Sequence, residues 1–457
     1  MAKNKNRDMI IMGFALFAIF FGAGNLIFPP YLGVISGTDW SAGMFGFLTT
    51  DPLLPVLGVV ATVLAGGSAD DLGKRVSSGF AKLIGTLAML IIGPFFAVPR
   101  TASVTHDIAV KSILPDFPAW GTSVIFFAIV FVLIFNQSKV IDIIGKYLTP
   151  VLIIVLAILI IKGIVSPIGD FHMPLVDQIG PAGTYFKGFT EGYQTMDALG
   201  AGLMAGIVIT DMKRRGYDNE GERKKLSFGV AAVSLILLAL VYGGLTYVGA
   251  TYSDKVLAGV DLANPEALNA ALDRASLLKG VTAEILGAPG AWLLAICVLF
   301  ACMTTATGLT STAGNFFSSN IFKDKVSYKV IVTICVIISL FVSILGTGQI
   351  IKIAVPVLFL IYPTFVVLIF LTLIGKYIKY DSVFVGAVAL TIPISIVSAL
   401  EVLGAFGIQL SWLAPISEAV AKLPFGTDGF PWVVPALIGA VCGLVFGVIT
   451  KGKKQAA

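Results

Sequence analysis

The chain has 457 residues, of which 57% are apolar and 12% are charged, and its formal net charge is +5. Soluble domains carry roughly 25% charged residues, so this composition excludes a soluble globular protein. The basic residues are spread through short loops and form no patch beside exposed aromatic residues, which argues against nucleic acid as a partner. The composition therefore predicts that most of the chain is surrounded by membrane lipid.

Long apolar runs follow one another from Ile10 to Ile449. About 20 apolar residues are enough for a helix to cross a bilayer core about 30 Å thick. Because lipid offers no hydrogen-bond partners and the runs lack the alternation of barrel strands, they predict an all-α polytopic membrane protein. We expect one transmembrane domain over 1–457 with about twelve spans, at 9–35, 41–65, 83–111, 120–136, 141–163, 186–210, 227–251, 284–316, 328–346, 350–374, 382–403 and 431–450.

The distribution of lysine and arginine predicts the orientation. An even number of spans places both termini on one side of the membrane. With that side in the cytoplasm, the cytoplasmic segments hold most of the 31 basic residues, and the loop DMKRRGYDNEGERKK over 211–225 is the most basic of them. The positive-inside rule therefore predicts cytoplasmic termini.

The first span contains a helix-breaking stretch, IFFGAGNLIFPP, with Pro29 and Pro30 at its end. Inside a helix, glycine costs about 1 kcal/mol and proline about 3 kcal/mol relative to alanine, whereas proline in a first helical turn loses no hydrogen bond. The stretch predicts two half-helices, one ending near Phe21 and the next starting near Leu26. Backbone groups freed at membrane depth are tolerated only where they line a cavity.

Such a break supplies ligands for both ends of an amino acid. Free N–H groups at a half-helix N-terminus attract a carboxylate, and unwound carbonyls suit an ammonium group or a bare cation. A zwitterion matches both. The predicted substrate-binding residues of the first span are Gly22, Ala23, Gly24 and Asn25.

The sixth span has a second interruption, EGYQTMDALGAG. Its predicted substrate-binding residues are Tyr193, Gln194, Thr195 and Asp197. Spans one and six open two five-span halves, about 9–163 and 186–374, which must be inverted because five is odd; two extra helices occupy about 382–450. Paired interruptions in repeats indicate a transporter site. Two other interpretations stay open: small residues can serve close helix packing, and Asp197 can cap its half-helix or tie it to a neighbour.

Span eight carries Ala301, Thr304 and Thr305, which share one helix face because they are spaced i, i+3, i+4. Two hydroxyls and the Ala301 carbonyl offer neutral oxygens to Na⁺, and the carbonyls of Ala18 and Phe21 are expected to complete the shell. An intramembrane threonine also commonly bonds a carbonyl one turn back, so that alternative remains.

The stretch FFGAGNLIFPPYLG and the twelve-span pattern resemble the bacterial branched-chain amino acid carriers of the BrnQ type, in the LIVCS family, over essentially the whole chain. The resemblance implies import of leucine, isoleucine and valine by alternating access and symport, with Na⁺ as the coupling ion. It also implies a bacterial inner-membrane location. No obligatory protein partner is inferred.

More distantly, GAGN followed by FP is similar to the first-span break of LeuT-type transporters, which implies a LeuT-type fold. Carried over, Gly24 and Asn25 match positions that hold the substrate carboxylate. Matching sodium-binding positions are Ala18, Phe21, Ala301, Thr304 and Thr305. The seventh span, GVAAVSLILLALVYGG, has no asparagine for a second sodium site, which argues against two sodium ions.

Three other functions stay open or are disfavoured. A proton-coupled transporter of another small amino acid or solute would need a titrating carboxylate, with Asp197 or Asp51 as candidates. A channel would need polar stripes along a pore. An enzyme would need a clustered nucleophile, acid and base or metal ligands inside the spans; the sequence offers no such cluster, so no catalytic residue is predicted.

Overall fold

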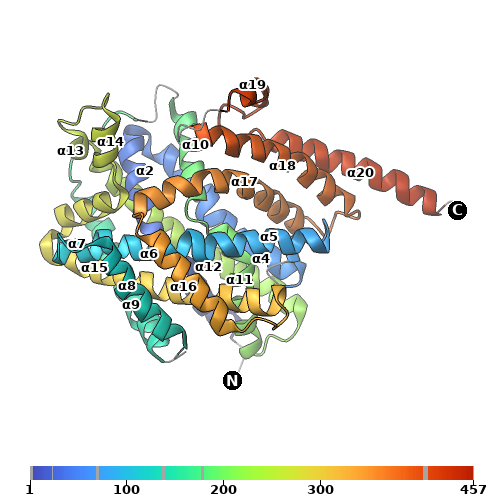
Figure 1. The fold of residues 1–457 in the computed structure, drawn as a ribbon, viewed down its shortest axis with the longest axis horizontal. Helices are drawn as coiled ribbons and strands as arrows, with labels where there is room; N and C mark the ends of the chain where they lie inside the picture. Colours follow the sequence, from blue (N-terminus) through green and yellow to red (C-terminus); the bar gives the residue numbers. More distant parts are fainter. Residues whose placement is uncertain are drawn as a thin grey trace.

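The computed structural model describes residues 4–22, 24–67, 71–135, 139–175, 180–404 and 410–455. These residues form helices and connecting segments without a strand (Figure 1). The all-α prediction is confirmed. Ala23 of the predicted site lies outside the described residues.

The longer helices are α1 (Lys5–Phe20), α2 (Phe28–Ser36), α3 (Trp40–Leu48), α4 (Leu54–Ala65), α5 (Ser78–Leu90), α6 (Ala97–Val104), α8 (Ala119–Phe135), α9 (Lys139–Val165), α10 (Gly180–Tyr193), α11 (Asp197–Arg214), α12 (Glu220–Thr251), α15 (Arg274–Asn315), α16 (Tyr328–Ser343), α17 (Thr347–Leu373), α18 (Ser382–Leu403) and α20 (Val433–Gln455). Shorter helical elements are α7 (Lys111–Ile113), α13 (Ser253–Leu257), α14 (Pro265–Ala271), α19 (Ala414–Ala421), η1 (Asn25–Ile27), η3 (Thr49–Leu53), η5 (Ile91–Phe95), η6 (Thr105–Val110) and η7 (Phe316–Ile321).

Within the described part of the chain, seven helical segments are long and apolar enough to cross a membrane, and an eighth is added if the bent pair α10 and α11 counts as one span. Three further apolar helices are shorter, at Ala119–Phe135, Pro150–Val165 and Tyr328–Ser343. The chain is therefore a multi-pass membrane protein. The number twelve and the division into two repeats stay predictions.

Spans two and three also contain interruptions. Asp51 in η3 directly precedes Pro52 and has an extended backbone (φ −141°, ψ 112°). Proline disfavours the helical conformation in the residue before it, which explains these angles. In η5, Gly93 leaves the helical region ahead of Pro94. Each proline also removes a backbone donor from its helix. These irregular turns place Asp51 and the start of α6 beside the centre of the molecule.

At the C-terminal end of the chain, α18 and α20 lie side by side and form one edge of the molecule together with α17 (Figure 1). Their backbones approach closely at two glycines, since a Cβ on Gly386 would fall 2.1 Å from the Gly439 carbonyl oxygen. Small residues let membrane helices pack at such short range. The two helices match the pair predicted over 382–450.

Candidate functional site

The first break is the segment from Phe21 to Gly24 between α1 and η1. Phe21 has φ −77° and ψ 69°, and the Gly22 N–H donates to the Phe20 carbonyl at 2.8 Å. These values are those of an inverse γ-turn. Helical structure resumes in η1 and continues in α2, whose first turn contains Pro29. The helical hydrogen-bonding pattern is therefore interrupted for a few residues, deep in the apolar interior.

This turn changes which carbonyls have donors. In a continuing helix the Gly22 N–H would bond the Ala18 carbonyl, and the Asn25 N–H would bond the Phe21 carbonyl. Instead, Gly22 donates to Phe20, and Asn25 donates to Gly22 at 3.0 Å. The turn thus deprives Ala18 and Phe21, the two carbonyls assigned to a cation by the sequence, of their helical donors.

The second break is the segment Gln194–Met196 between α10 and α11, whose axes differ by 49°. Met196 has a left-handed backbone (φ 66°, ψ 6°) although it is not glycine. The Thr195 hydroxyl donates to the Gly192 carbonyl at 2.8 Å and so bonds within the turn. The sequence predicts an interruption beside Asp197, and the glycines of EGYQTMDALGAG flank this turn instead of forming it.

The two breaks are joined by one side chain. The Asn25 amide Nδ2 donates to Asp197 Oδ2 at 2.6 Å and to the Phe20 carbonyl at 3.0 Å, and lies 3.5 Å from the Tyr242 hydroxyl. Asp197 stands in the first turn of α11, and its carboxylate accepts this bond from Asn25. Of the alternatives left open by the sequence, the structure therefore favours Asp197 as a tie between the unwound segments.

Arg100, which lies on α6 in the third predicted span, donates hydrogen bonds to the carbonyls of the second break. Its Nη1 donates to the Gln194 carbonyl, and its Nη2 donates to the Thr195 carbonyl at 3.3 Å. The guanidinium carbon lies 5.3 Å from the centre of the Phe28 ring. A protein cation thus occupies carbonyls that the sequence had offered to a substrate ammonium. In the sequence, Arg100 stands out as a charged residue inside an apolar run, which by default suggests a functional role.

Asp51 is completely buried, with 0% of its surface exposed. Neither carboxylate oxygen has a hydrogen-bond partner among the described residues. Asp51 interacts electrostatically with Asp197 and Arg100, so two carboxylates face one guanidinium. Burying an uncompensated charge is costly. With both carboxylates ionised, this central cluster of Asp51, Asp197 and Arg100 carries one negative charge in excess, which a bound cation or a proton on either carboxylate would balance.

The threonine pair of span eight lies on α15 at the first break. A Cβ on Gly22 would be 3.5 Å from Thr305 Oγ1, so this hydroxyl is next to the turn. Thr304 Oγ1 donates to the Ala301 carbonyl at 2.9 Å, which is the back-bond allowed for by the alternative interpretation. A hydroxyl that donates one bond still has lone pairs to offer a cation.

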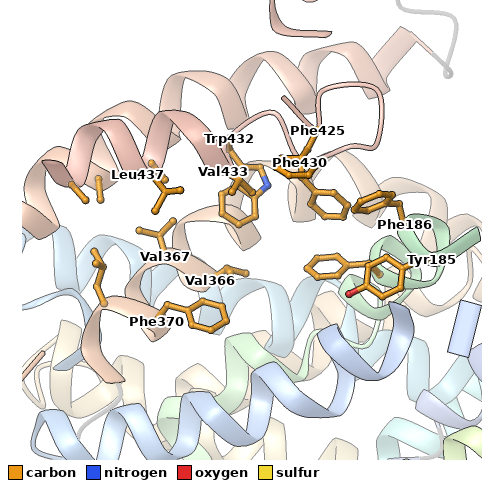
Figure 2. A pocket seen from close by; sticks show the side chains of 15 residues that line it. Tyr185, Phe186, Val366, Val367, Phe370, Phe425, Phe430, Trp432, Val433 and Leu437 are labelled. Atoms are coloured by element: carbon orange, nitrogen blue, oxygen red, sulfur yellow. The ribbon is translucent and has the colours of Figure 1, made fainter. Parts of the chain in front are cut away.

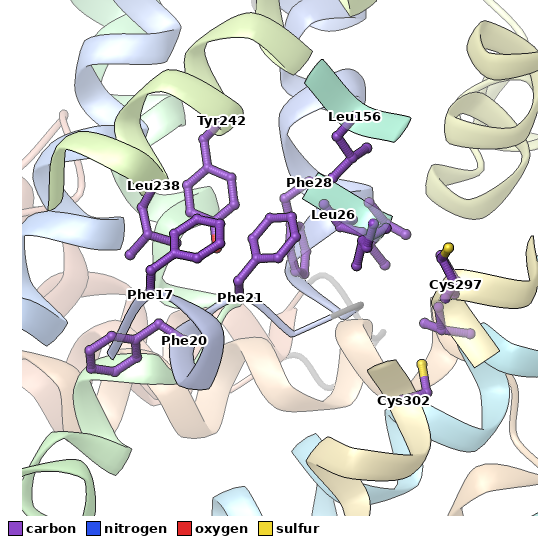
Figure 3. Close-up of a cluster of buried hydrophobic side chains, with 14 of the residues drawn as sticks. Phe17, Phe20, Phe21, Leu26, Phe28, Leu156, Leu238, Tyr242, Cys297 and Cys302 are labelled. Carbon is purple, nitrogen blue, oxygen red and sulfur yellow. The ribbon is translucent and has the colours of Figure 1, made fainter. Parts of the chain in front are cut away.

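Aromatic side chains enclose the first break (Figure 3). Phe17 and Phe21 stack with ring centres 4.8 Å apart, and Phe21 lies 6.3 Å from the ring of Tyr242. At the second break, Tyr193 is buried with its ring 4.4 Å from that of Tyr362. The centre of the molecule is therefore a polar cluster inside an apolar, aromatic shell.

Two cavities with charged residues in their walls lie near the breaks. One, of about 530 Å³, is lined by α10 as far as Gln194 and includes Glu191 and Arg274. The other, of about 690 Å³, lies between α1, as far as Ile19, and α11. Glu191 binds Arg274 at 2.8 Å. Each cavity reaches residues next to one break.

A third cavity, of about 400 Å³, lies between α10, α17 and α20 (Figure 2). Its wall is made of apolar and aromatic side chains such as Phe186, Phe430 and Trp432. A zwitterion needs charged or polar partners when it leaves water. This cavity is therefore not suited to an amino acid.

Solved structures show the class of this fold. Mhp1 in an inward-facing conformation has a TM-score of 0.56 with 13% identity, covering 97% of this chain and 91% of that chain. Mhp1 in a closed conformation with bromovinylhydantoin bound has a TM-score of 0.60, 13% identity and coverage of 96% and 93%. A Na⁺-coupled sialic acid symporter in a substrate-bound outward-open state has a TM-score of 0.56 with 15% identity, covering 96% of this chain and 89% of that chain. The chain has the LeuT-type transporter fold.

The family follows from sequence. Residues 5–450 match the model of the branched-chain amino acid transport protein family. The branched-chain amino acid permease BrnQ of Bacillus subtilis is 34% identical over 446 residues, which are 96% of this chain and 97% of that protein. The branched-chain amino acid transport system 2 carrier protein of Pseudomonas aeruginosa is 35% identical over 454 residues, with 96% coverage of both chains. The protein belongs to this family, which confirms the resemblance and makes it a transporter, not an enzyme.

Proposed function

We propose that this protein imports the branched-chain amino acids leucine, isoleucine and valine by symport with Na⁺. The observation that carries the proposal is the meeting of two broken spans, joined by Asn25 and Asp197, at the centre of a chain from a branched-chain amino acid transport family. The substrate lies between Gly22–Asn25 and Tyr193–Asp197. One methylene in an apolar pocket is worth only about 1–3 kcal/mol, so the three substrates are poorly separated.

The charge of the central cluster supports coupling to one monovalent cation. A zwitterionic substrate adds no net charge, whereas Asp51, Asp197 and Arg100, which interact with one another, leave one negative charge in excess when both carboxylates are ionised. One Na⁺ restores neutrality in a medium where net charge is costly. Its oxygen ligands are the carbonyls of Ala18, Phe21 and Ala301 and the hydroxyls of Thr304 and Thr305.

The Na⁺ ion stabilises the first break, because it replaces the helical donors that two carbonyls lack there. The cavity that reaches Gln194 and the cavity between α1 and α11 are the two access routes. Rocking of one bundle against the other opens them in turn. The protein lies in the bacterial inner membrane with both termini in the cytoplasm, as the basic loops require.

Proton coupling is the second candidate, and the unpartnered Asp51 carboxylate favours it. A proton on Asp51 or Asp197 would neutralise the central cluster as well as Na⁺ would. The two candidates differ in which variant removes coupling. Asp51→Asn abolishes the dependence of uptake on a pH gradient if a proton is the coupling ion, whereas Thr304→Ala leaves that dependence intact.

The test is uptake of labelled leucine into proteoliposomes under an inward sodium gradient, with a potassium control at matched pH and membrane potential. We expect saturable, sodium-dependent uptake that Thr304→Ala reduces strongly. The matched control is Thr312→Ala, since Thr312 is partly buried on the same helix, as Thr304 is, and also donates to a carbonyl of its own helix. Equal uptake without sodium would remove the sodium site; no leucine uptake under any gradient would contradict the substrate.

A further inference from the structure

Arg100 has an unused donor at the centre of the molecule. A guanidinium has five N–H donors, and the described hydrogen bonds of Arg100 use Nη1 and Nη2. Its Nε has no hydrogen-bond partner among the described residues, and the side chain is only 3% exposed. Buried polar groups are nearly always hydrogen-bonded, so an unpaired cationic N–H indicates a partner that is not part of the chain.

The unused edge of the guanidinium faces the first break. A Cβ on Gly24 would lie 3.2 Å from Nε and 3.4 Å from Nη2, so the absence of a side chain at Gly24 leaves this edge uncovered. Nε and a neighbouring Nη form a fork that matches the two oxygens of a carboxylate.

Of the two residues that the sequence assigned to the carboxylate, Gly24 and Asn25, the second has its donors engaged elsewhere. The Asn25 N–H donates to the Gly22 carbonyl, and the Asn25 side chain donates to Asp197 and to the Phe20 carbonyl. Arg100 is therefore the cationic donor that faces the break with a free position.

We propose that Arg100 binds the carboxylate of the amino-acid substrate through Nε and Nη2, beside Gly24. This inference rests on the proposed function and names the residue that recognises one end of its substrate. The ammonium group then lies toward Asp51 and Asp197, so the zwitterion aligns with the charges of the central cluster. Lysine is a poor substitute, because it presents a point charge without the fork.

The test measures binding to purified protein in detergent with NaCl, by isothermal titration calorimetry. The probes are leucine, leucinamide, which lacks the carboxylate, and 4-methylpentanoate, which lacks the ammonium group. Wild type is expected to bind leucine more tightly than leucinamide. Truncating one partner of a buried charge pair typically weakens binding about 30-fold or more, so Arg100→Gln should weaken leucine and 4-methylpentanoate by that factor and leave leucinamide nearly unchanged. Arg100→Lys should fall in between.

A merely structural Arg100 gives a different result. If it only holds the Gln194 and Thr195 carbonyls, Arg100→Gln weakens leucine and leucinamide by the same factor, and the proposal is overturned. Equal affinity of wild type for leucine and leucinamide also overturns it. Arg75→Gln is the control, because Arg75 pairs with Asp381 away from both breaks, and it should change none of the affinities.

A second variant decides the matter if Arg100→Gln does not fold. Gly24 has a right-handed helical backbone (φ −60°, ψ −30°), so Gly24→Ala introduces no backbone strain but covers the fork. We expect a selective loss of leucine with leucinamide spared, and an unchanged ratio of the two affinities would refute the role of Arg100. Absence of leucine binding by folded wild type would contradict the proposed function itself, and the inference would fall with it.

Discussion

Both breaks leave backbone carbonyls without their helical hydrogen-bond donors, and the two breaks differ in what replaces those donors. At the first break, an inverse γ-turn directs the Gly22 and Asn25 N–H groups to other carbonyls, and Ala18 and Phe21 lose their helical donors. At the second break, Arg100 supplies donors from span three to the carbonyls of Gln194 and Thr195. Unsatisfied backbone groups are expensive inside a membrane. The second break is satisfied by a protein cation, and the proposed function places a bound Na⁺ at the first.

The difference lies in where the cation comes from. The second break contains a permanent cation, whereas the first break leaves room for one that binds and leaves. A transporter needs a site that changes with occupancy, since a ligand shifts an equilibrium only by its different affinity for the two states. Under the proposed function, the ion-sensitive part of the cycle is expected at the first break and the constant part at the second.

The largest expected effect comes from separating the two breaks. Asp197→Ala removes the acceptor of the Asn25 amide, and hydrogen bonds to charged groups are worth about 1.5–3 kcal/mol. We expect leucine uptake into proteoliposomes to fall at least about tenfold. Asp197→Asn, which keeps an acceptor oxygen, should retain part of the uptake. Normal uptake by the alanine variant would show that the two breaks work independently.

A smaller effect is expected at the first break alone. Thr305→Val removes a hydroxyl beside Gly22 while keeping the shape of the side chain. Loss of one oxygen ligand should raise the half-saturating sodium concentration for leucine uptake about tenfold, which corresponds to about 1.4 kcal/mol. Thr312→Val on the same helix should leave that concentration unchanged. If both variants behave alike, the ion does not lie at this break.

The smallest effect concerns the backbone of the second break. Met196 has a left-handed conformation that costs an ordinary residue about 1–2 kcal/mol. Met196→Gly relieves this cost but also empties a buried position, since Met196 is 1% exposed. Loss of a buried methionine side chain costs about 2–5 kcal/mol, so the melting temperature of the purified protein should fall by several degrees, with sodium dependence unchanged. Met196→Val should lower the melting temperature, because β-branched residues tolerate this conformation poorly. A change in sodium dependence in either variant would contradict the constant role of the second break.

Helix ends and lipid-facing helices depend on local energetics, so they could be predicted from residues close together in the chain. Long apolar runs must form helices, because lipid offers the backbone no hydrogen-bond partners. The Gly-rich stretch before Pro29 lies where α1 ends and α2 begins. The resemblance to the branched-chain carriers rested on the same stretch. These features need no knowledge of what lies across the molecule.

The partners inside the centre were decided by the tertiary structure. Arg100 and Asp51 were visible as charges in apolar runs, but only the packing of α6 and η3 against the second break shows that one fills carbonyls and the other has no partner. Asn25 reaches Asp197 across 172 positions of sequence. Composition and spacing set the energy of a residue in its own helix, whereas the meeting of distant charges depends on how the helices pack, and that is a property of the whole chain.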